Sequence, residues 1–390
     1  MVAAIEIVEL TQSLIKCPSV TPADAGALDV LQGALERLGF VCYRLPFRED
    51  NTGTVDNLYA RLGSGSPNFC YAGHTDVVPP GDIADWSYAP FEASVKDGFI
   101  YGRGAVDMKG AIAAFVVATK KFLDCLSDDN RTLSGSISLL ITGDEEGAAI
   151  NGTKKVLGWL HEHGETLDHC LVGEPTNRAE LGDMVKVGRR GSLNAEITVK
   201  GVQGHVAYPE AATNPIRGLT TILSALQSHS FDDGTENFQT SNLEVTSVDV
   251  GNEATNVIPA CASARVNIRF GDGQDSSSLS HWIRNLCDAH AKDYNLDVRI
   301  SGEAFLTPPG AFTRIVSSAV EEVSGTMPTL STSGGTSDAR FIKDICPVVE
   351  FGLVGRTMHK VDECVSISDL EMLSGVYRSV LERYFLKTNK

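Results

Sequence analysis

Four short apolar runs recur along this chain, and each ends in a glycine followed by polar residues, directly or after a loop. Apolar runs of this length are typical of buried strands. They cover residues 69–72, 136–142, 170–172 and 346–351. The polar residues after them are, in chain order, His74, Asp76, Asp144, Glu145, Glu146, Glu174 and His359. Each predicted strand therefore ends near side chains that can exchange protons or bind metals.

Segments with helical periodicity lie between these runs. Residues 4–16 and 23–38 predict amphipathic helices, the second ending at Gly39. A third helical pattern begins near Met108, which predicts that Asp107 caps its N-terminus. Strands that alternate with helices predict an α/β domain with a mainly parallel sheet and helices on both faces. The carboxyl ends of such strands meet at one edge of the sheet, so the polar residues that follow them should converge.

The pattern changes near residue 183. The segments that follow are a strand that alternates from Val185 through residues 191–201, a helix at 214–227, strands at 243–250 and 262–270, a helix at 277–294 and a strand at 297–300. This order predicts an inserted α+β domain with a four-stranded sheet and two helices on one face. A proline and glycine cluster at residues 307–310 marks a joint. We therefore predict a catalytic domain in two parts, residues 1–182 and 303–390, and an inserted domain at residues 183–302.

Composition and charge exclude several classes of protein. The net charge of −17 argues against nucleic acid or an anionic membrane surface as a partner. The N-terminus is acidic where a signal peptide needs positive charge, and the longest apolar run, residues 111–118, is too short to span a bilayer. Nine cysteines include no Cys-x-x-Cys pair, which argues against a disulfide framework. These features predict a soluble, cytoplasmic protein.

The convergence of acidic side chains needs an explanation. A single aspartate before a helix is usually a cap, and a single histidine after a strand is usually a surface or packed side chain. Here the same arrangement recurs at several strand ends. Uncompensated carboxylates in one crevice would repel one another and resist ionisation. Bound divalent cations would remove that difficulty.

The motifs at these strand ends resemble those of a known group of enzymes. GHTDVVPPGD, GRGAVDMKG, TGDEEG and GEP, with His359, resemble the binuclear zinc deacylase and aminopeptidase superfamily. Within it, GRRGS, GHVAYPE, TNVIPA and TSGGTSDARF are similar to the desuccinylase family that acts on N-succinyl-L,L-diaminopimelate. The resemblance spans about residues 5–385, and the ordered set of motifs is more specific than any one of them.

The resemblance implies two zinc ions per subunit, for which cobalt can substitute. One ion would be bound by His74, Asp107 and Glu174, and the other by Asp107, Glu146 and His359. Asp107 would then bridge the pair. Imidazole and carboxylate are suitable zinc ligands, and each ion would keep a position open for water or substrate.

The resemblance also implies the catalytic roles. Asp76 would fix the tautomer of His74 through its second ring nitrogen. Glu145 would be the general base that takes a proton from a zinc-bridging water and passes it to the leaving amine. His205, in the inserted domain, would stabilise the oxyanion. The resemblance also implies substrate contacts by Arg189, Tyr208, Asn256, Arg269, Thr336 and Arg340. The guanidinium groups of the three arginines suit a substrate that carries carboxylates.

The expected reaction is hydrolysis of N-succinyl-L,L-diaminopimelate to succinate and L,L-diaminopimelate, a step of lysine and cell-wall precursor synthesis. In the resembled family the inserted domain is a lid and a dimer interface, so we expect a homodimer in which His205 serves its own site or that of its neighbour. One segment departs from the family pattern, because Gly355-Arg356 replaces the Asn-Ala pair of VNATIH. Because of this departure, the resemblance does not determine which acyl group the enzyme removes.

Two other functions are compatible with parts of the pattern. The first is another deacylase of the superfamily, such as an acetylornithine deacetylase, or a dipeptidase. The second is a non-catalytic binding protein on the same scaffold. The second reading requires a missing ligand or base, and none is missing from the sequence.

Overall fold

The computed structural model describes residues 5–129 and 131–386, which form two compact units. The first unit consists of the described residues up to Val187, Thr307–Ser331 and the described residues from Ser337 onward. The second consists of Gly188–Leu306 and Thr332–Thr336. The second unit is thus an insertion in the chain of the first, and each unit has its own sheet.

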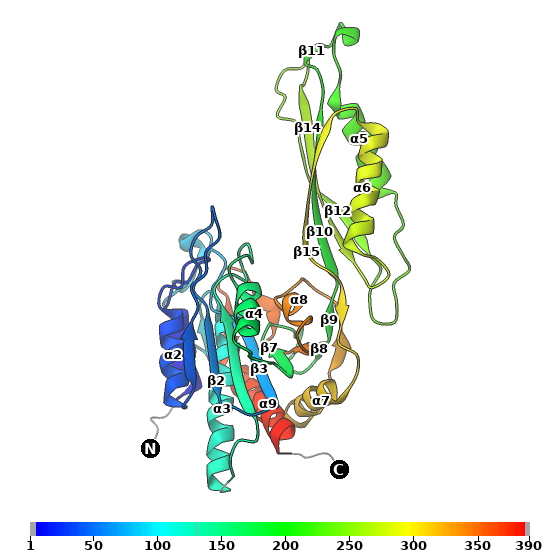
Figure 1. The fold of residues 1–390 in the computed structure, drawn as a ribbon. Coiled ribbons are helices and arrows are strands. Elements are labelled where there is room, and N and C mark those ends of the chain that lie inside the picture. The colour runs from blue at the N-terminus through cyan, green and yellow to red at the C-terminus, as the bar shows by residue number, and fades with distance from the viewer. Residues whose placement is uncertain (1–4, 130, 387–390) are drawn as a thin grey trace. The chain divides into compact units, whose positions relative to one another are not determined.

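The first unit contains an eight-stranded sheet (Figure 1). Its strands, in spatial order, are β1 (Val41–Arg44), β2 (Leu58–Leu62), β6 (Ser136–Thr142), β3 (Asn68–His74), β7 (His169–Val172), β18 (Val348–Glu350), β8 (Met184–Lys186) and β17 (Thr329–Ser331). The centre, from β6 through β3 and β7 to β18, is parallel, whereas β1, β2 and β8 pair antiparallel with neighbours. The sheet is therefore mixed with a parallel core, which confirms the predicted α/β class.

Seven helices accompany this sheet among the described residues. They are α1 (Ile7–Ile15), α2 (Ala27–Arg37), α3 (Gly110–Asp128), α4 (Thr153–Glu162), α7 (Ala311–Ser324), α8 (Ala339–Ile342) and α9 (Ile367–Phe385). Helix α9 packs on α3 and α7, while α4 and α8 pack on each other and against β6 and β18. Every residue of β3 and β6 is buried, as expected for strands that are covered on both faces. No helix of the described segments is long and apolar enough to cross a membrane.

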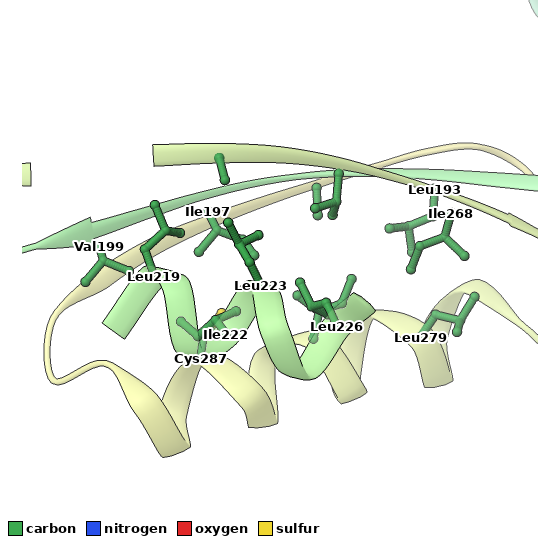
Figure 2. Packing of buried hydrophobic residues seen from close by; sticks show 14 of the residues in the cluster. Leu193, Ile197, Val199, Leu219, Ile222, Leu223, Leu226, Ile268, Leu279 and Cys287 are labelled. Atoms are coloured by element: carbon green, nitrogen blue, oxygen red, sulfur yellow. The ribbon is translucent and has the colours of Figure 1, made fainter. Parts of the chain in front are cut away.

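The second unit is an antiparallel sheet with two helices. The sheet contains, in order, β12 (Asn242–Asp249), β14 (Cys261–Phe270), β10 (Gly191–Lys200) and β15 (Tyr294–Gly302). Helices α5 (Pro215–Gln227) and α6 (Ser276–His290) pack on one face. Figure 2 shows Leu219, Leu226 and Leu279 of the helices in the layer between helices and sheet, with Leu219 toward the end that carries Val199 and Leu279 toward the end that carries Leu193 and Ile268. The alternation of buried and outward residues in β14 explains why one face carries the helices.

Short strands complete both units. The first unit also contains β4 (Ser94–Lys96), β5 (Phe99–Tyr101) and β19 (Cys364–Ser366), and the second contains β9 (Gly188–Arg189), β11 (Gly204–His205), β13 (Val257–Ile258) and β16 (Phe305–Leu306). Strand β19 pairs with β5, so the segment after His359 lies beside the segment that precedes Asp107.

Two predicted boundaries are wrong. The strand predicted to run from Val185 through residues 191–201 is β10 (Gly191–Lys200) of the second unit, but it begins later than predicted, because Val185 belongs to β8 and pairs with Leu330 of β17. The helix predicted at residues 277–294 ends at His290, because Tyr294 begins β15 and pairs with Val199 of β10. In both places pairing with a distant strand decided the conformation.

Candidate metal centre

Three of the strand ends bring their polar residues together in the first unit. His74 is the last residue of β3 and lies opposite Thr142, the last residue of β6. Glu145 and Glu146 follow β6 after a short turn, and Glu174 follows β7. Because β3, β6 and β7 are parallel neighbours, their carboxyl ends share one edge. The expectation that these side chains converge is confirmed.

Asp107 lies between two imidazoles. Its Oδ1 is 3.1 Å from Nε2 of His74, and its Oδ2 is 3.2 Å from Nε2 of His359. Nε2 of His74 is also 3.6 Å from Oε1 of Glu174, and Nε2 of His359 is 2.9 Å from Oε1 of Glu146. The potential donor atoms of each set lie within 4.8 Å of one another. The geometry therefore contains two adjoining sets of three residues that share one carboxylate.

Two glycines allow the strand ends to pack this closely. A Cβ on Gly73, directly before His74, would lie 2.4 Å from Cε of Met108. A Cβ on Gly173, directly before Glu174, would lie 1.9 Å from the hydroxyl oxygen of Tyr71. No other residue type could occupy Gly173 without displacing that buried tyrosine. Close packing against Met108 and Tyr71 therefore explains why these two apolar runs end in glycine.

Asp107 does not cap the following helix, contrary to the prediction. Helix α3 begins at Gly110, and its N-cap position is Lys109, which makes no side-chain cap. Asp107 belongs to an irregular turn, Ala105–Lys109, in which its own φ and ψ are −121° and 94°. This conformation turns its carboxylate toward the two histidines instead of the helix N-terminus.

Asp76 contacts the second ring nitrogen of His74 through its backbone carbonyl and not through its carboxylate. Nδ1 of His74 lies 2.9 Å from the backbone carbonyl of Asp76, while the nearer carboxylate oxygen is 3.6 Å away. The carboxylate of Asp76 instead accepts hydrogen bonds from the backbone N–H groups of Glu145, at 3.3 Å, and Glu146, at 3.0 Å. Asp76 therefore orients the ring through its main chain and fixes the acidic turn through its side chain.

Burial and charge control protonation in this cluster. Burial raises the pKa of Glu145 well above its ordinary value, and the charge of Glu174 raises it further. Hydrogen bonds with Asp107 and Glu146 raise the pKa of His359 to about 10, against the opposing effect of burial. A divalent cation would reverse both tendencies, because it favours ionised carboxylates and neutral imidazoles.

Both donor sets fit a divalent metal ion. Each offers one imidazole and two carboxylates, which are suitable ligands for zinc, and three protein ligands leave a position open. A further group of potential donors contains His74, Glu145 and Glu146. Glu145 is thus close enough to His74 to be a ligand as well as a base, and experiment must separate the two roles.

The residues predicted to contact substrate are divided between the two units. Arg340 alone belongs to the first unit, where its Nη2 lies 3.5 Å from Oδ1 of the buried Asp338. The others, which belong to the second unit with His205, are Arg189, Tyr208, Asn256, Arg269 and Thr336. His205 and Asn256 are exposed, and the Tyr208 ring is 5.7 Å from the His205 ring. Arg189 donates to the carbonyl of Gly335 at 3.0 Å.

Arg356, which marks the departure from the family pattern, is bound to backbone carbonyls. Its Nε donates to the carbonyl of Arg178 at 3.4 Å, and its Nη2 donates to that of Ala179. The side chain lines a pocket of about 550 Å³. Thr357 and Asp369 also line this pocket, and none of the proposed metal ligands does. The guanidinium group therefore contacts main chain on this side of the first unit.

Sequence reasoning missed three buried charged residues near the ligands. Arg103 and Glu363 form an ion pair, and Asp338, whose Oδ1 lies 3.5 Å from Nη2 of Arg340, is buried, which raises its pKa. Arg103 lies between two glycines in GRGAVDMKG, and Glu363 lies four residues after His359. Their proximity to ligands in the sequence is the only signal that could have identified them.

Comparisons with known proteins agree with this geometry. Peptidase family M20/M25/M40 matches residues 70–383. A protein from Rhodospirillum centenum named succinyl-diaminopimelate desuccinylase is 59% identical over 378 residues, covering 97% of each chain. An M20 metallo-carboxypeptidase from Sulfolobus solfataricus shares the fold with a TM-score of 0.79 at 17% identity, covering 97% of this chain and 99% of its own.

A second solved structure shares the fold at similar distance. It is a dinuclear metal-binding M20 peptidase from Bacillus subtilis, with a TM-score of 0.67 at 17% identity over 98% of both chains. The family match covers well over half of this chain, and the identity to the Rhodospirillum centenum protein extends over nearly all of it. This chain belongs to peptidase family M20/M25/M40.

Proposed function

We propose that this chain hydrolyses the amide bond of N-succinyl-L,L-diaminopimelate, releasing succinate and L,L-diaminopimelate, with two zinc ions at the centre described above. The observation that carries the proposal is the pair of three-residue donor sets that share Asp107. The substrate is supported by the Rhodospirillum centenum relative, which is named for this activity and is similar over 97% of the chain.

The proposed ligands are His74, Asp107 and Glu174 for one ion and Asp107, Glu146 and His359 for the other. Zinc in such a site supplies Lewis-acid polarisation of a carbonyl and lowers the pKa of water. The dinuclear metal-binding relative supports the count of two. Zinc as the metal, and the cytoplasm as the compartment, stay predictions.

Glu145 is the proposed general base. It accepts the proton of the attacking water and delivers it to the nitrogen of the leaving amine when the amide C–N bond breaks. Two features of its surroundings support this role. Its backbone N–H donates to the carboxylate of Asp76, which restrains the turn, and its carboxylate lies within 4.8 Å of donor atoms of His74 and Glu146, beside the proposed ions.

The second unit and Arg340 of the first unit supply the proposed contacts to the rest of the substrate. His205 donates a hydrogen bond to the oxyanion of the tetrahedral intermediate. Arg189, Arg269 and Arg340 bind carboxylate groups of the substrate through charge-assisted hydrogen bonds. Nη1 of Arg269 is buried and has no hydrogen-bond partner among the described residues, which supports a role as a free donor.

A substrate panel tests the proposed function. The zinc-loaded protein should turn over N-succinyl-L,L-diaminopimelate with a kcat/KM at least 10²-fold above those for N-acetylornithine and dipeptides, because unpaired buried polar groups penalise the wrong substrate. Succinate release measured by an enzyme-coupled assay gives the values. A higher kcat/KM for the acetyl substrate or a dipeptide would reject the assignment and favour another deacylase or a dipeptidase.

We further propose that the second unit joins two chains in a homodimer and that His205 completes the site of the partner chain. Its exposed position in the second unit supports the proposal, because an exposed donor is available to a neighbouring chain. If the second unit closes over the substrate as a lid, a donor on it would also couple substrate capture to oxyanion stabilisation.

Mixing two inactive variants tests the assignment of His205. Each variant alone, His205→Ala or Glu145→Gln, should lose on the order of 10²–10³ in kcat or more. In a mixed dimer, one site would receive both changes and the other neither, so activity should return on mixing. If subunit exchange is demonstrated and activity does not return, His205 serves its own chain.

A further inference from the structure

We propose that the buried pair of Arg103 and Glu363 positions the proposed metal ligands Asp107 and His359 by holding their main chain. The inference deepens the proposed function and rests on it, since it concerns the same centre. Neither Arg103 nor Glu363 belongs to a group of described residues that could hold a metal ion itself. They act on the centre through the backbone of its ligands.

Glu363 holds the turn that carries Asp107. Its Oε1 accepts hydrogen bonds from the backbone N–H groups of Val106, at 2.9 Å, and Asp107, at 3.2 Å. Asp107 lies in a turn whose backbone angles are not helical, so a regular hydrogen-bond ladder does not fix its direction. The carboxylate of Glu363 supplies the acceptors that this turn needs.

Arg103 holds the segment that carries His359. The second carboxylate oxygen of Glu363 accepts a hydrogen bond from Nη1 of Arg103 at 2.7 Å. The same guanidinium group donates to the carbonyls of Lys360, at 3.2 Å, and His359, at 3.4 Å. The flat face of the guanidinium group lies over the ring of Trp86, with 5.3 Å between the guanidinium carbon and the ring centroid. The planar group is thus used on its edge and its face.

The backbone of His359 shows why such support is required. Its φ is +62°, in the left-handed region that residues other than glycine adopt uncommonly. A residue in that region persists only where its surroundings hold it. Asp362, three residues later, has a φ of +57° and accepts hydrogen bonds from the N–H and hydroxyl of Ser87 at 2.8 and 2.7 Å.

The charge balance makes the pair a single unit. The side chains of Arg103 and Glu363 are 3% and 0% exposed. A buried ion pair gives little net stability, but the loss of one partner leaves an uncompensated buried charge. The pair is therefore better explained by what it orients than by a contribution to folding. The pair connects two ligands that lie in distant parts of the sequence. Asp107 donates its backbone N–H to Glu363, and the backbone carbonyl of His359 accepts a hydrogen bond from Arg103.

Metal binding to the metal-free protein measures this role directly. We expect Glu363→Gln to lower the affinity for the ion held by Asp107, Glu146 and His359 by about 10–100-fold, since the loss of a group that orients ligands typically has this effect. The amide keeps one acceptor oxygen but loses the charge. Competition titration with zinc gives the affinities, and the visible absorption of bound cobalt reports the ligand geometry independently of turnover.

A matched control separates positioning from stability. Val316→Ala truncates a buried aliphatic side chain on α7, outside this network, and should lower the unfolding midpoint without changing metal affinity. Arg103→Lys keeps the charge that Glu363 requires but cannot reach both the carboxylate and the two carbonyls. It should fold, lower the affinity by less than Glu363→Gln and alter the cobalt spectrum. If Glu363→Gln does not fold, the metal affinity and cobalt spectrum of Arg103→Lys test the inference instead.

The outcomes distinguish this inference from the proposed function. If the unaltered protein bound fewer than two ions, the proposed function would fail. If it bound two ions, and both Glu363→Gln and Arg103→Lys bound them with unchanged affinity and an unchanged cobalt spectrum, the proposed function would stand. In that case the pair would be a structural ion pair only, and the inference would be rejected.

Discussion

Replacing Glu145 by glutamine should lower kcat by about 10²–10⁴-fold while both metal ions stay bound. Glutamine has the shape of glutamate but cannot accept the proton of the attacking water. The backbone N–H of residue 145 would still donate to Asp76, so the turn should keep its conformation. The binding of substrate should change little, because the carboxylate acts on the reacting water. Steady-state kinetics and metal analysis of the same preparation give the two required values.

Glu146→Gln is the matched control for this experiment. Its Oε1 lies 2.9 Å from Nε2 of His359 in the second donor set, so the substitution should weaken metal binding. The comparison matters because Glu145 also lies within reach of His74. If Glu145→Gln lost an ion but kept its activity per bound ion, Glu145 would be the ligand and Glu146 the candidate base.

Complete removal of metal should abolish hydrolysis, and zinc or cobalt should restore it. The reaction needs a strongly polarised carbonyl and a water whose pKa is lowered toward neutral pH, and the proposed cations supply both. A chelator followed by gel filtration prepares the metal-free protein, and elemental analysis verifies it. Magnesium should restore little, because it demands near-octahedral oxygen ligation and each donor set contains an imidazole.

A sample carried through the same steps without chelator is the control. It should retain its activity, which excludes damage by the procedure. Circular dichroism should show that the metal-free protein keeps its secondary structure, since the core of the first unit is formed by β3, β6 and α3 independently of the centre. Unchanged turnover by protein that is verified to be metal-free would exclude a metal-dependent reaction.

The convergence of the ligands could be predicted from the sequence for a simple reason. The runs that form β3, β6 and β7 are short and apolar, and the segments after β3 and β6 return the chain to parallel strands of the same sheet. In that topology the residues after the strands must meet at one edge. His74, Glu146 and Glu174 follow this rule. The order of elements in the second unit was also predictable, because its strands alternate and its helices have clear periodicity.

The details that failed depend on distant partners. The helical pattern after Met108 predicted Asp107 as a cap, but Glu363, more than 250 residues later, holds its turn in another conformation. No local pattern encodes that contact. The sequence did not indicate that Asp76 would reach His74 through its backbone carbonyl, while its carboxylate accepts hydrogen bonds from the N–H groups of Glu145 and Glu146. The ion pair of Arg103 and Glu363 could not be predicted either, because its two residues are also far apart in the sequence.

The central claim is that one carboxylate, Asp107, joins two metal sites. Anomalous diffraction from crystals of the zinc-loaded protein, collected above and below the zinc absorption edge, tests it most directly. The account predicts two peaks, one beside His74 and Glu174 and one beside Glu146 and His359, with the carboxylate of Asp107 between them. A single peak, or two peaks of which one lacks Asp107 as a ligand, would contradict it.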